Sequence, residues 1–170
     1  MPEMWDLYNE NREPLGETHE RGKPIDKDKF HIVVDILSVN AEGKILITRR
    51  SPEKTFGGMW EITGGSAVAG ETPRIAAARE LFEETGLSAD PLELEYRGEI
   101  VRRGSHGGNA IHVFYLHKGD FSEQDIRLQQ GETTDFKILT PAEIKAMTDR
   151  GEFLDFSYDR MRAMFPNETK

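Results

Sequence analysis

The chain has 170 residues, 36% of them hydrophobic and 31% charged, which suits one domain with a core and a well-solvated surface. Its formal net charge of −9 repels nucleic acid and anionic membranes, so we expect neither as a partner. The absence of cysteine excludes disulfides, thiolate zinc sites and cysteine nucleophiles. No apolar run approaches the ~20 residues of a membrane-spanning helix and the N-terminus is too polar for a signal peptide, so we expect a cytoplasmic protein.

The first part of the chain reads as a hairpin followed by a charged loop. MWDLY and LGETHERG flank the polar turn NENREP, a pattern typical of two paired strands. We therefore assign residues 1–29 to an N-terminal hairpin and loop, and residues 30–170 to the core of a single domain.

Three strands are predicted next. FHIVVDILSV is rich in β-branched residues and suits a buried strand, and ILITRRS is a second strand after the turn NAEGK. MWEIT is a short third strand that precedes the pair Gly64–Gly65.

A helix follows, and it is the clearest element of the sequence. Thr72 and Pro73 are typical of an N-cap and a first helical residue, and Gly86 is typical of a C-terminal stop. The spacing predicts an apolar face made of Ile75, Ala78 and Phe82, with Ala77 and Leu81.

The rest of the chain alternates between strands and helices. LELEYRGEIVRR and AIHVFYLHK alternate as strands do, FKIL followed by TPAEIKAMTDRG predicts a strand and then a helix, and DFSYDRMRAMF predicts a last helix. Strands interleaved with helices predict an α/β sandwich on a mixed sheet.

Three carboxylates crowd the C-terminal end of the first helix. Glu80 is three and four residues from Glu83 and Glu84, so the three side chains are neighbours that repel, each pair at a cost of roughly 0.2–0.5 kcal/mol. The helix dipole disfavours them as well. A solvated acidic face is one reading. The other is a site for a hard divalent cation such as Mg²⁺, which takes oxygen ligands and substrate phosphates.

The residues around this cluster resemble the signature of the Nudix hydrolases. Gly65, five residues, Glu71, seven residues and then Arg79-Glu80-Leu81-Phe82-Glu83-Glu84-Thr85-Gly86-Leu87 match every defined position of that signature. The resemblance implies an α/β/α sandwich around a mixed β-sheet. It also implies Mg²⁺- or Mn²⁺-dependent hydrolysis of a small molecule in which a nucleoside diphosphate is linked to another group, and it leaves a homodimer open.

The same resemblance implies roles for single residues. Glu80, Glu83 and Glu84 would bind metal together with the carbonyl of Gly65, and Glu80 is also a candidate base. Arg79 would orient the carboxylates, and Glu71 would support the loop or bind an extra ion. Relatives often add a carboxylate from a later loop. In QQGETTDFKIL we expect Glu132, with Asp135 second, although an ordinary polar turn fits as well.

The segment before this signature is similar to isopentenyl-diphosphate isomerase, a Nudix-fold enzyme that does not hydrolyse. WDLYNENREPLGETHERG, FHIVV, ILITRRS and GMW have similar counterparts there, and His19 and His31 match two of its metal-binding histidines. Gly64 stands where the isomerase needs a cysteine, and Ser66 stands where a third histidine would bind. We therefore expect a hydrolase of an isomerase-like branch. His19 and His31 are relics, packing residues or substrate contacts, and the spacing of His106, His112 and His117 indicates no ligand set.

Four residues are candidates for contact with substrate. Arg49 and Arg50 end a strand and can reach phosphate, or else form surface ion pairs. Phe56 and Trp60 lie on either side of GGM, where an aromatic ring can stack on a base, although Trp60 equally suits the core. The alternatives to a hydrolase are an isoprenoid diphosphate isomerase and a catalytically silent ligand-sensing domain. The sequence leaves the attached group X open.

Overall fold

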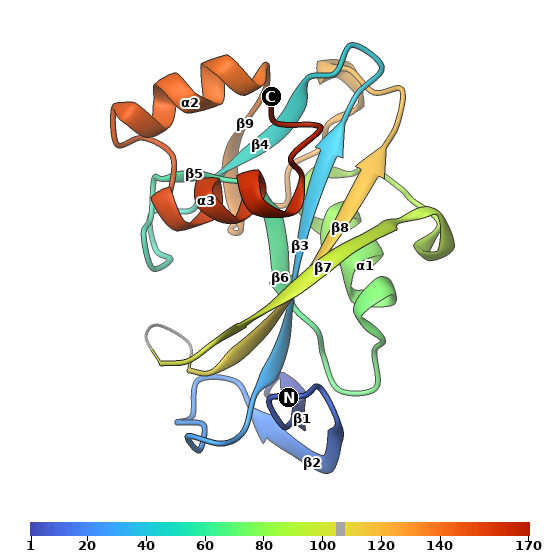
Figure 1. Ribbon diagram of the computed structural model, residues 1–170, viewed down its shortest axis with the longest axis vertical. Coiled ribbons are helices and arrows are strands. Elements are labelled where there is room, and N and C mark those ends of the chain that lie inside the picture. Colours follow the sequence, from blue (N-terminus) through green and yellow to red (C-terminus); the bar gives the residue numbers. More distant parts are fainter. Residues whose placement is uncertain (105–107) are drawn as a thin grey trace.

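The computed structural model describes residues 1–104 and 108–170. Within them the chain forms a mixed sheet with helices on both faces, and a separate two-stranded hairpin at the N-terminus (Figure 1). The strands are β1 (Met4–Tyr8), β2 (Pro14–Glu20), β3 (His31–Val39), β4 (Ile45–Arg50), β5 (Trp60–Glu61), β6 (Thr63–Ser66), β7 (Glu95–Arg102), β8 (Ala110–Lys118) and β9 (Thr133–Leu139). The helices are α1 (Pro73–Thr85), α2 (Pro141–Asp149) and α3 (Asp155–Met164), with the 3-10 turns η1 (Pro91–Glu93) and η2 (Glu123–Asp125).

The predicted N-terminal hairpin is confirmed. β1 and β2 pair in antiparallel fashion, with Trp5 opposite His19. The hairpin is attached to the main sheet through the Trp5 ring, which stacks on the buried His31 ring with centroids 3.9 Å apart, and through a bridge between Tyr8 and Phe30.

The main sheet has the strand order β5-β4-β3-β8-β7, with β6 added to β3 and β9 added to β4. β3 runs parallel to β8, and the other pairs are antiparallel. β3 pairs with β6 over Val33–Ile36 but with β4 only at Ser38 and Val39. The sheet therefore divides along β3 into a branch with β6 and a branch with β4, β5 and β9.

This division corrects one predicted strand. MWEIT does not form a single strand, because Trp60–Glu61 pairs with β4 whereas Thr63–Ser66 pairs with β3. The change of partner places Gly64 and Gly65 inside a strand, at the point where the two branches separate.

Both faces of the sheet are covered, which confirms the predicted sandwich. Alternate residues of β3 point to opposite sides, so Ile32, Val34 and Ile36 pack with α1 in one core cluster while Leu37 and Val39 pack with α2 and α3 in another. α1 and the pair α2 and α3 lie on opposite sides of the sheet in Figure 1.

The ends of α1 are those predicted, but only part of its predicted buried face is correct. Thr72 accepts a hydrogen bond from the Ile75 amide, and Gly86 ends the helix in the left-handed region at φ 77°. Ile75 and Phe82, however, are 49% and 57% exposed. Ala77 and Leu81 are buried as predicted, and the other buried side chains are Ala76, Glu84 and Thr85. The small alanines let α1 approach the sheet closely, and this orientation turns Glu84 inward.

Candidate active site

The three carboxylates of α1 face the strand β6. Glu84 is 5% exposed, and its Oε2 accepts a hydrogen bond of 3.3 Å from the Gly64 amide. Gly65 lies against Glu80 so closely that a Cβ at this position would collide with the Glu80 carboxylate. Glu83 is more exposed, at 40% of its side chain. The buried face of α1 therefore brings Glu84 and Glu80 to the backbone of Gly64 and Gly65.

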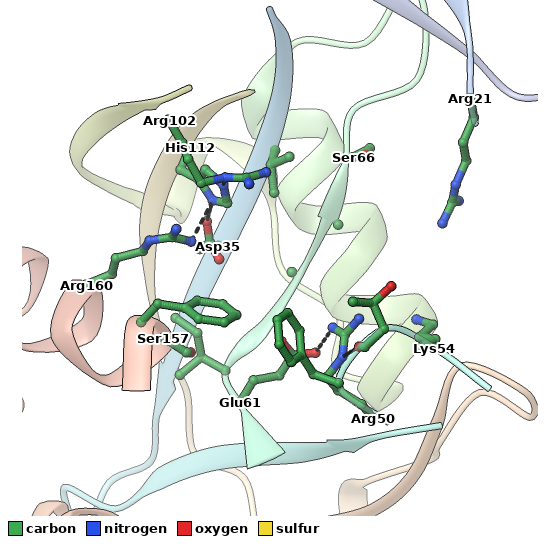
Figure 2. Close-up of a pocket in the computed structure, with 17 residues that line it drawn as sticks. Arg21, Asp35, Arg50, Lys54, Glu61, Ser66, Arg102, His112, Ser157 and Arg160 are labelled. Atoms are coloured by element: carbon green, nitrogen blue, oxygen red, sulfur yellow. Dashed lines mark hydrogen bonds and ion pairs between the residues drawn. The ribbon is translucent and has the colours of Figure 1, made fainter. Parts of the chain in front are cut away.

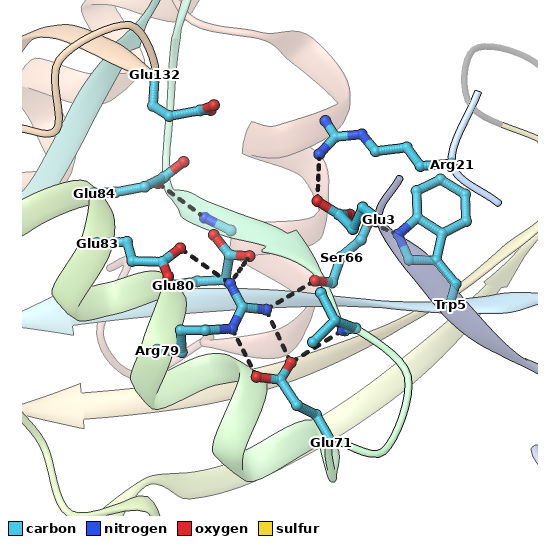
Figure 3. A network of polar contacts seen from close by, with 12 residues as sticks. Glu3, Trp5, Arg21, Ser66, Glu71, Arg79, Glu80, Glu83, Glu84 and Glu132 are labelled. Carbon is cyan, nitrogen blue, oxygen red and sulfur yellow. Dashed lines mark hydrogen bonds and ion pairs between the residues drawn. The ribbon is translucent and has the colours of Figure 1, made fainter. Parts of the chain in front are cut away.

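Arg79 connects these carboxylates to the loop before the helix (Figure 3). Its Nε and Nη2 donate to the two oxygens of Glu71 at 2.7 and 2.9 Å. Its Nη1 donates to Glu80 at 2.7 Å and to Glu83 at 3.0 Å, and Nη2 also reaches the Ser66 carbonyl at 3.0 Å. One guanidinium thus holds three carboxylates and one carbonyl, as expected of a residue that orients them.

The same network shifts the pKa of both ends of the Arg79–Glu71 pair. The hydrogen bonds to Glu71 raise the pKa of Arg79, despite its partial burial. Burial alone would raise the pKa of Glu71, but Arg79 and the Val68 amide together bring that pKa below its ordinary value. Glu71 therefore holds the loop as a charged group.

The pKa of Glu84 is shifted in the opposite direction. Burial raises it well above its usual range, and the neighbouring carboxylates of Glu61 and Glu80 raise it further against the pull of Lys54 and the Gly64 amide. Burial also raises the pKa of Glu80 and Glu61, against the pull of Arg79 and Arg50 respectively. The charged form of these carboxyl groups is therefore disfavoured where α1 meets β6.

The donors present fit a hard divalent cation in their chemistry. They are carboxylate oxygens, and the most buried of them is crowded by two further carboxylates, a situation that a divalent cation relieves. Across residues 1–104 and 108–170, no three His, Asp or Glu side chains are arranged to hold such an ion. In Figure 3, Arg79 Nη1 engages both Glu80 and Glu83. Each of the two carboxylates keeps a second oxygen that Arg79 Nη1 does not engage, so an ion could bind there while Arg79 still orients the side chains.

The late loop brings one of its two predicted carboxylates to the cluster. Glu132 forms an ion pair with Lys54 and is close enough to Glu80 to raise the pKa of that residue. Asp135 is exposed, and its Oδ1 accepts from the Phe136 amide at 2.8 Å. The structure therefore favours Glu132 over Asp135 as the added carboxylate.

A pocket of about 610 Å³ opens on the other side of β6. Gly64, Gly65 and Ser66 line it, so the backbone that touches the α1 carboxylates also borders the pocket. Figure 2 shows one group of charged residues around Arg50, Lys54 and Glu61, and a second group elsewhere in the pocket that consists of Asp35, Arg102, His112 and Arg160.

The four predicted substrate contacts differ in where they lie. Arg50 lines the pocket and donates to Glu61 at 2.6 Å. Phe56 also lines the pocket and is 43% exposed. Arg49 is outside the pocket lining, with its Nε bound to the Gly58 carbonyl. Trp60 is 6% exposed and belongs to the core. Its ring cannot stack on a base, so the predicted substrate contact is wrong for this residue.

The two histidines matched to the isomerase flank Trp5. His31 is buried and stacked on that ring, and His19 lies 6.4 Å from it with Nε2 at 3.0 Å from the Lys23 carbonyl. An indole packed against both imidazoles fits the packing alternative. Among the others, His117 contacts Ser38, and His106 lies outside the described residues.

Sequence reasoning missed the second charged group of the pocket. His112 Nδ1 is 2.6 Å from Asp35 Oδ2, and each residue interrupts a largely apolar run, IVVDIL in β3 and AIHVFYL in β8. A lone polar residue inside a buried strand is the signal that could have found them. Arg102 and Arg160 carry no comparable signal, because β7 and α3 are far apart in the chain.

Comparison with known proteins identifies the family. The model of the NUDIX domain matches residues 29–156. An uncharacterised Nudix hydrolase of Listeria monocytogenes is 32% identical over 158 residues, which are 92% of this chain and 90% of the relative. An RNA pyrophosphohydrolase of Halorhodospira halophila is 28% identical over 83% of this chain and 75% of its own length.

Solved structures share the fold. A Deinococcus radiodurans protein superimposes with a TM-score of 0.77 at 24% identity, over 96% of this chain and 99% of that one. None of the helices in the described residues is long and apolar enough to cross a membrane. On the family model and the Listeria relative, this chain belongs to the Nudix hydrolase family.

Proposed function

We propose that the protein hydrolyses a diphosphate linkage in a nucleoside diphosphate-X or related small molecule, with water attacking phosphorus and Mg²⁺ or Mn²⁺ bound. The observation that carries the proposal is the burial of Glu84 beside Glu61 and Glu80. Ionising a carboxylate in such a place is unfavourable. A divalent cation reverses that effect and leaves coordination positions for phosphate and water.

Glu80, Glu83 and Glu84 would hold the ion together with the Gly65 carbonyl. When bound, the ion neutralises phosphate charge and acidifies a water molecule. The close approach of Gly65 to Glu80 supports this set, because it brings strand and helix donors to one place. Arg79 and Glu71 would position the carboxylates through the contacts that already tie the loop to α1.

Two cationic residues of the pocket suit the diphosphate. Arg50 and Lys54 lie beside the carboxylate cluster and line the pocket, where positive charge stabilises the oxygens of a phosphoryl group during transfer. Glu132 would accept the proton of the attacking water, since it stands outside α1 and keeps a cationic partner in Lys54. Glu80 is the alternative base.

We also propose that the protein is a hydrolase of the isomerase-like branch. A Cβ on Gly64 would lie 2.5 Å from the Val34 carbonyl oxygen, so the cysteine of the isomerase does not fit this backbone. Ser66 stands in place of the third metal-binding histidine. The chain therefore lacks both the thiol and the imidazole that the isomerase uses for allylic proton transfer. Isopentenyl diphosphate should therefore give no dimethylallyl diphosphate above a metal-only blank.

We further propose that the hairpin and the core act as one domain over residues 1–170. The family model begins at residue 29, but the Ala69 amide donates to the Met4 carbonyl and the Gly70 amide donates to Asp6. The hairpin thus binds the loop that Glu71 and Arg79 hold.

The test is a panel of diphosphate compounds in which the mass of every product is recorded. It should include sugar nucleotides, dinucleotides, damaged triphosphates and coenzyme diphosphates. We expect turnover with Mg²⁺ or Mn²⁺, none with excess chelator, and ¹⁸O from labelled water in a phosphate product. Turnover that persists in chelator would contradict the metal assignment, and binding without any turnover would favour the ligand-sensing alternative.

A further inference from the structure

The pocket carries more positive charge than the diphosphate site explains. Its lining includes the cationic residues Arg21, Arg50, Lys54, Arg102 and Arg160, against the carboxylates of Asp35 and Glu61. The whole chain has a net charge of −9, so this excess is local. Arg21 is paired with Glu3, Arg50 with Glu61 and Lys54 with Glu132. Arg102 and Arg160 meet at a different place, the His112 ring.

The protonation of His112 follows from its two neighbours. Nδ1 lies 2.6 Å from Asp35 Oδ2, so this nitrogen carries hydrogen and donates it to the carboxylate. Nε2 lies 3.3 Å from Arg102 Nε, a donor, so it acts as the acceptor. The two ring nitrogens therefore have different roles, with Nδ1 donating to Asp35 and Nε2 accepting from Arg102.

This tautomer leaves the Arg160 guanidinium without an acceptor in the described part of the chain. Its Nη1 is 3.4 Å from His112 Nδ1, which already carries hydrogen and cannot accept. Among the described residues no carboxylate lies within 4.0 Å of its guanidinium. The group stacks instead over the Phe156 ring, at 5.2 Å from its centroid. Stacking holds the guanidinium plane while its N–H groups stay able to donate.

Arg102 and Arg160 also repel each other. They come from β7 and α3, on different sides of His112, and Figure 2 shows both directed at that ring. Burial lowers the pKa of Arg102, and the positive charge of Arg160 lowers it further. Two guanidiniums held this close are stabilised by an oxyanion placed between them, and their forked donors match phosphate.

We propose that Arg102 and Arg160 form a subsite for a phosphate monoester on the part of the substrate remote from the scissile diphosphate. The inference deepens the proposed function and rests on it, because the same pocket is bordered by Gly64–Ser66, which touch the α1 carboxylates. The preferred substrates are then diphosphates that bear an additional phosphate monoester on one of the two groups joined by the diphosphate.

Hydrolysis of matched substrate pairs tests the selectivity. Coenzyme A and dephospho-coenzyme A differ by one phosphate monoester, as do NADPH and NADH. We expect the phosphorylated member to have a KM lower by about tenfold or more, the effect of one or two charged hydrogen bonds. Arg160→Ala and Arg102→Ala should bring the ratio of the two KM values within a pair close to one. Arg160→Lys should keep part of the difference. An equal KM within both pairs, or a ratio unchanged in Arg160→Ala, would overturn the proposal.

Each variant has a control on the same element or next to it. Arg162 lies on α3 near the Tyr158 hydroxyl, and Arg103 is paired with Glu10. Neither lines the pocket, so Arg162→Ala and Arg103→Ala should keep the wild-type ratio. Loss of the ratio in these controls would point to a general loss of charge and count against the subsite. Circular dichroism melts establish that each variant is folded.

Binding of inorganic phosphate in excess chelator separates this inference from hydrolysis. We expect phosphate to raise the melting temperature of the wild type more than that of Arg160→Ala, with Arg162→Ala like the wild type. Equal shifts in wild type and Arg160→Ala would overturn the subsite even if diphosphates are hydrolysed. If phosphate binding depends on Arg160 but no diphosphate is hydrolysed, the subsite stands and the proposed function fails.

Discussion

The two charged regions on either side of β6 are built on opposite principles. On the α1 side, Glu71, Glu80 and Glu83 share the single guanidinium of Arg79, and Glu84 lies beyond its reach. On the pocket side, Arg102 and Arg160 stand around one carboxylate, Asp35, which His112 already holds.

The difference shows what each side lacks. The first region has an excess of carboxylates that a cation would offset, and the second has an excess of guanidiniums that an anion would offset. A phosphorylated substrate bound with a divalent ion supplies both charges. The predictions below change one region at a time, in order of expected effect.

Glu84→Gln and Glu83→Gln should have the largest effect. Each removes a proposed metal ligand, and since losing even the partners of metal ligands costs about 10–100-fold, we expect kcat to fall by more than about a hundredfold. Stability without metal should be unchanged or higher, because Gln at position 84 places no charge in a buried site. Steady-state kinetics and thermal melts check both points, with Glu42→Gln at a remote turn as the control. A mutant that melts well below wild type would show a structural role instead.

Glu132→Gln should come next. A general base contributes roughly 10²–10⁴-fold, so we expect kcat to fall by about a hundredfold or more while KM changes little, since the base acts mainly in the transition state. Asp135→Asn is the matched control from the same segment and should have a smaller effect. A kcat near wild type for Glu132→Gln would return the base role to Glu80.

Metal binding should be visible without any substrate. Binding to the folded state alone stabilises it by about 2.7 kcal/mol at a hundred times Kd, so Mg²⁺ or Mn²⁺ should raise the melting temperature of the wild type. Glu84→Gln should respond much less at the same concentrations. Equal shifts in both proteins would place the ion somewhere other than α1.

Glu71→Gln should have the smallest effect, on stability rather than chemistry. It breaks the paired contact with Arg79, at a cost of about 2 kcal/mol. The matched control is Glu152→Gln, which breaks a similar contact with Arg150 in an exposed place and should cost less than about 1 kcal/mol.

The effect of Glu71→Gln should also depend on pH. The pKa of Glu71 is lower in the folded protein than its ordinary value of 4.5, so the unfolded chain binds the proton more readily. The stability that Glu71 contributes is therefore complete above pH 4.5 and is lost as the pH falls through the folded pKa. Denaturant unfolding of wild type and mutant should converge in that acidic range. A difference that persists there would assign the effect to packing.

Patterns of adjacent residues predict the helices and strands well. They do not predict features that depend on contacts between distant parts of the chain. Thr72 and Gly86 mark the ends of α1 because capping depends on a few adjacent residues. The predicted buried face of α1 is correct at Ala77 and Leu81 and wrong at Ile75 and Phe82, because helical spacing alone allows both pairs. Only packing against β6 decides between these faces, and it favours the one that buries Glu84.

The same limit applies to the site. The α1 carboxylates, Arg79 and Glu71 lie within one short segment, so their spacing along the chain is informative. The pocket joins side chains from β3, β7, β8 and α3, and no spacing along the chain relates Arg102 to Arg160. Trp60 is ambiguous for a similar reason, since an aromatic residue beside a glycine loop can face either way.

Gly65 and Gly131 limit substitution for two unrelated structural reasons. Gly131 has φ +88°, and a Cβ added to it would meet nothing within 4 Å, so asparagine, which tolerates the left-handed region, is its best replacement. Gly65 has an ordinary backbone, but any side chain there meets the Glu80 carboxylate. In a library of all single variants, position 131 should therefore accept a small set of residues, whereas a substitution at position 65 should displace the Glu80 carboxylate and lower activity more than stability.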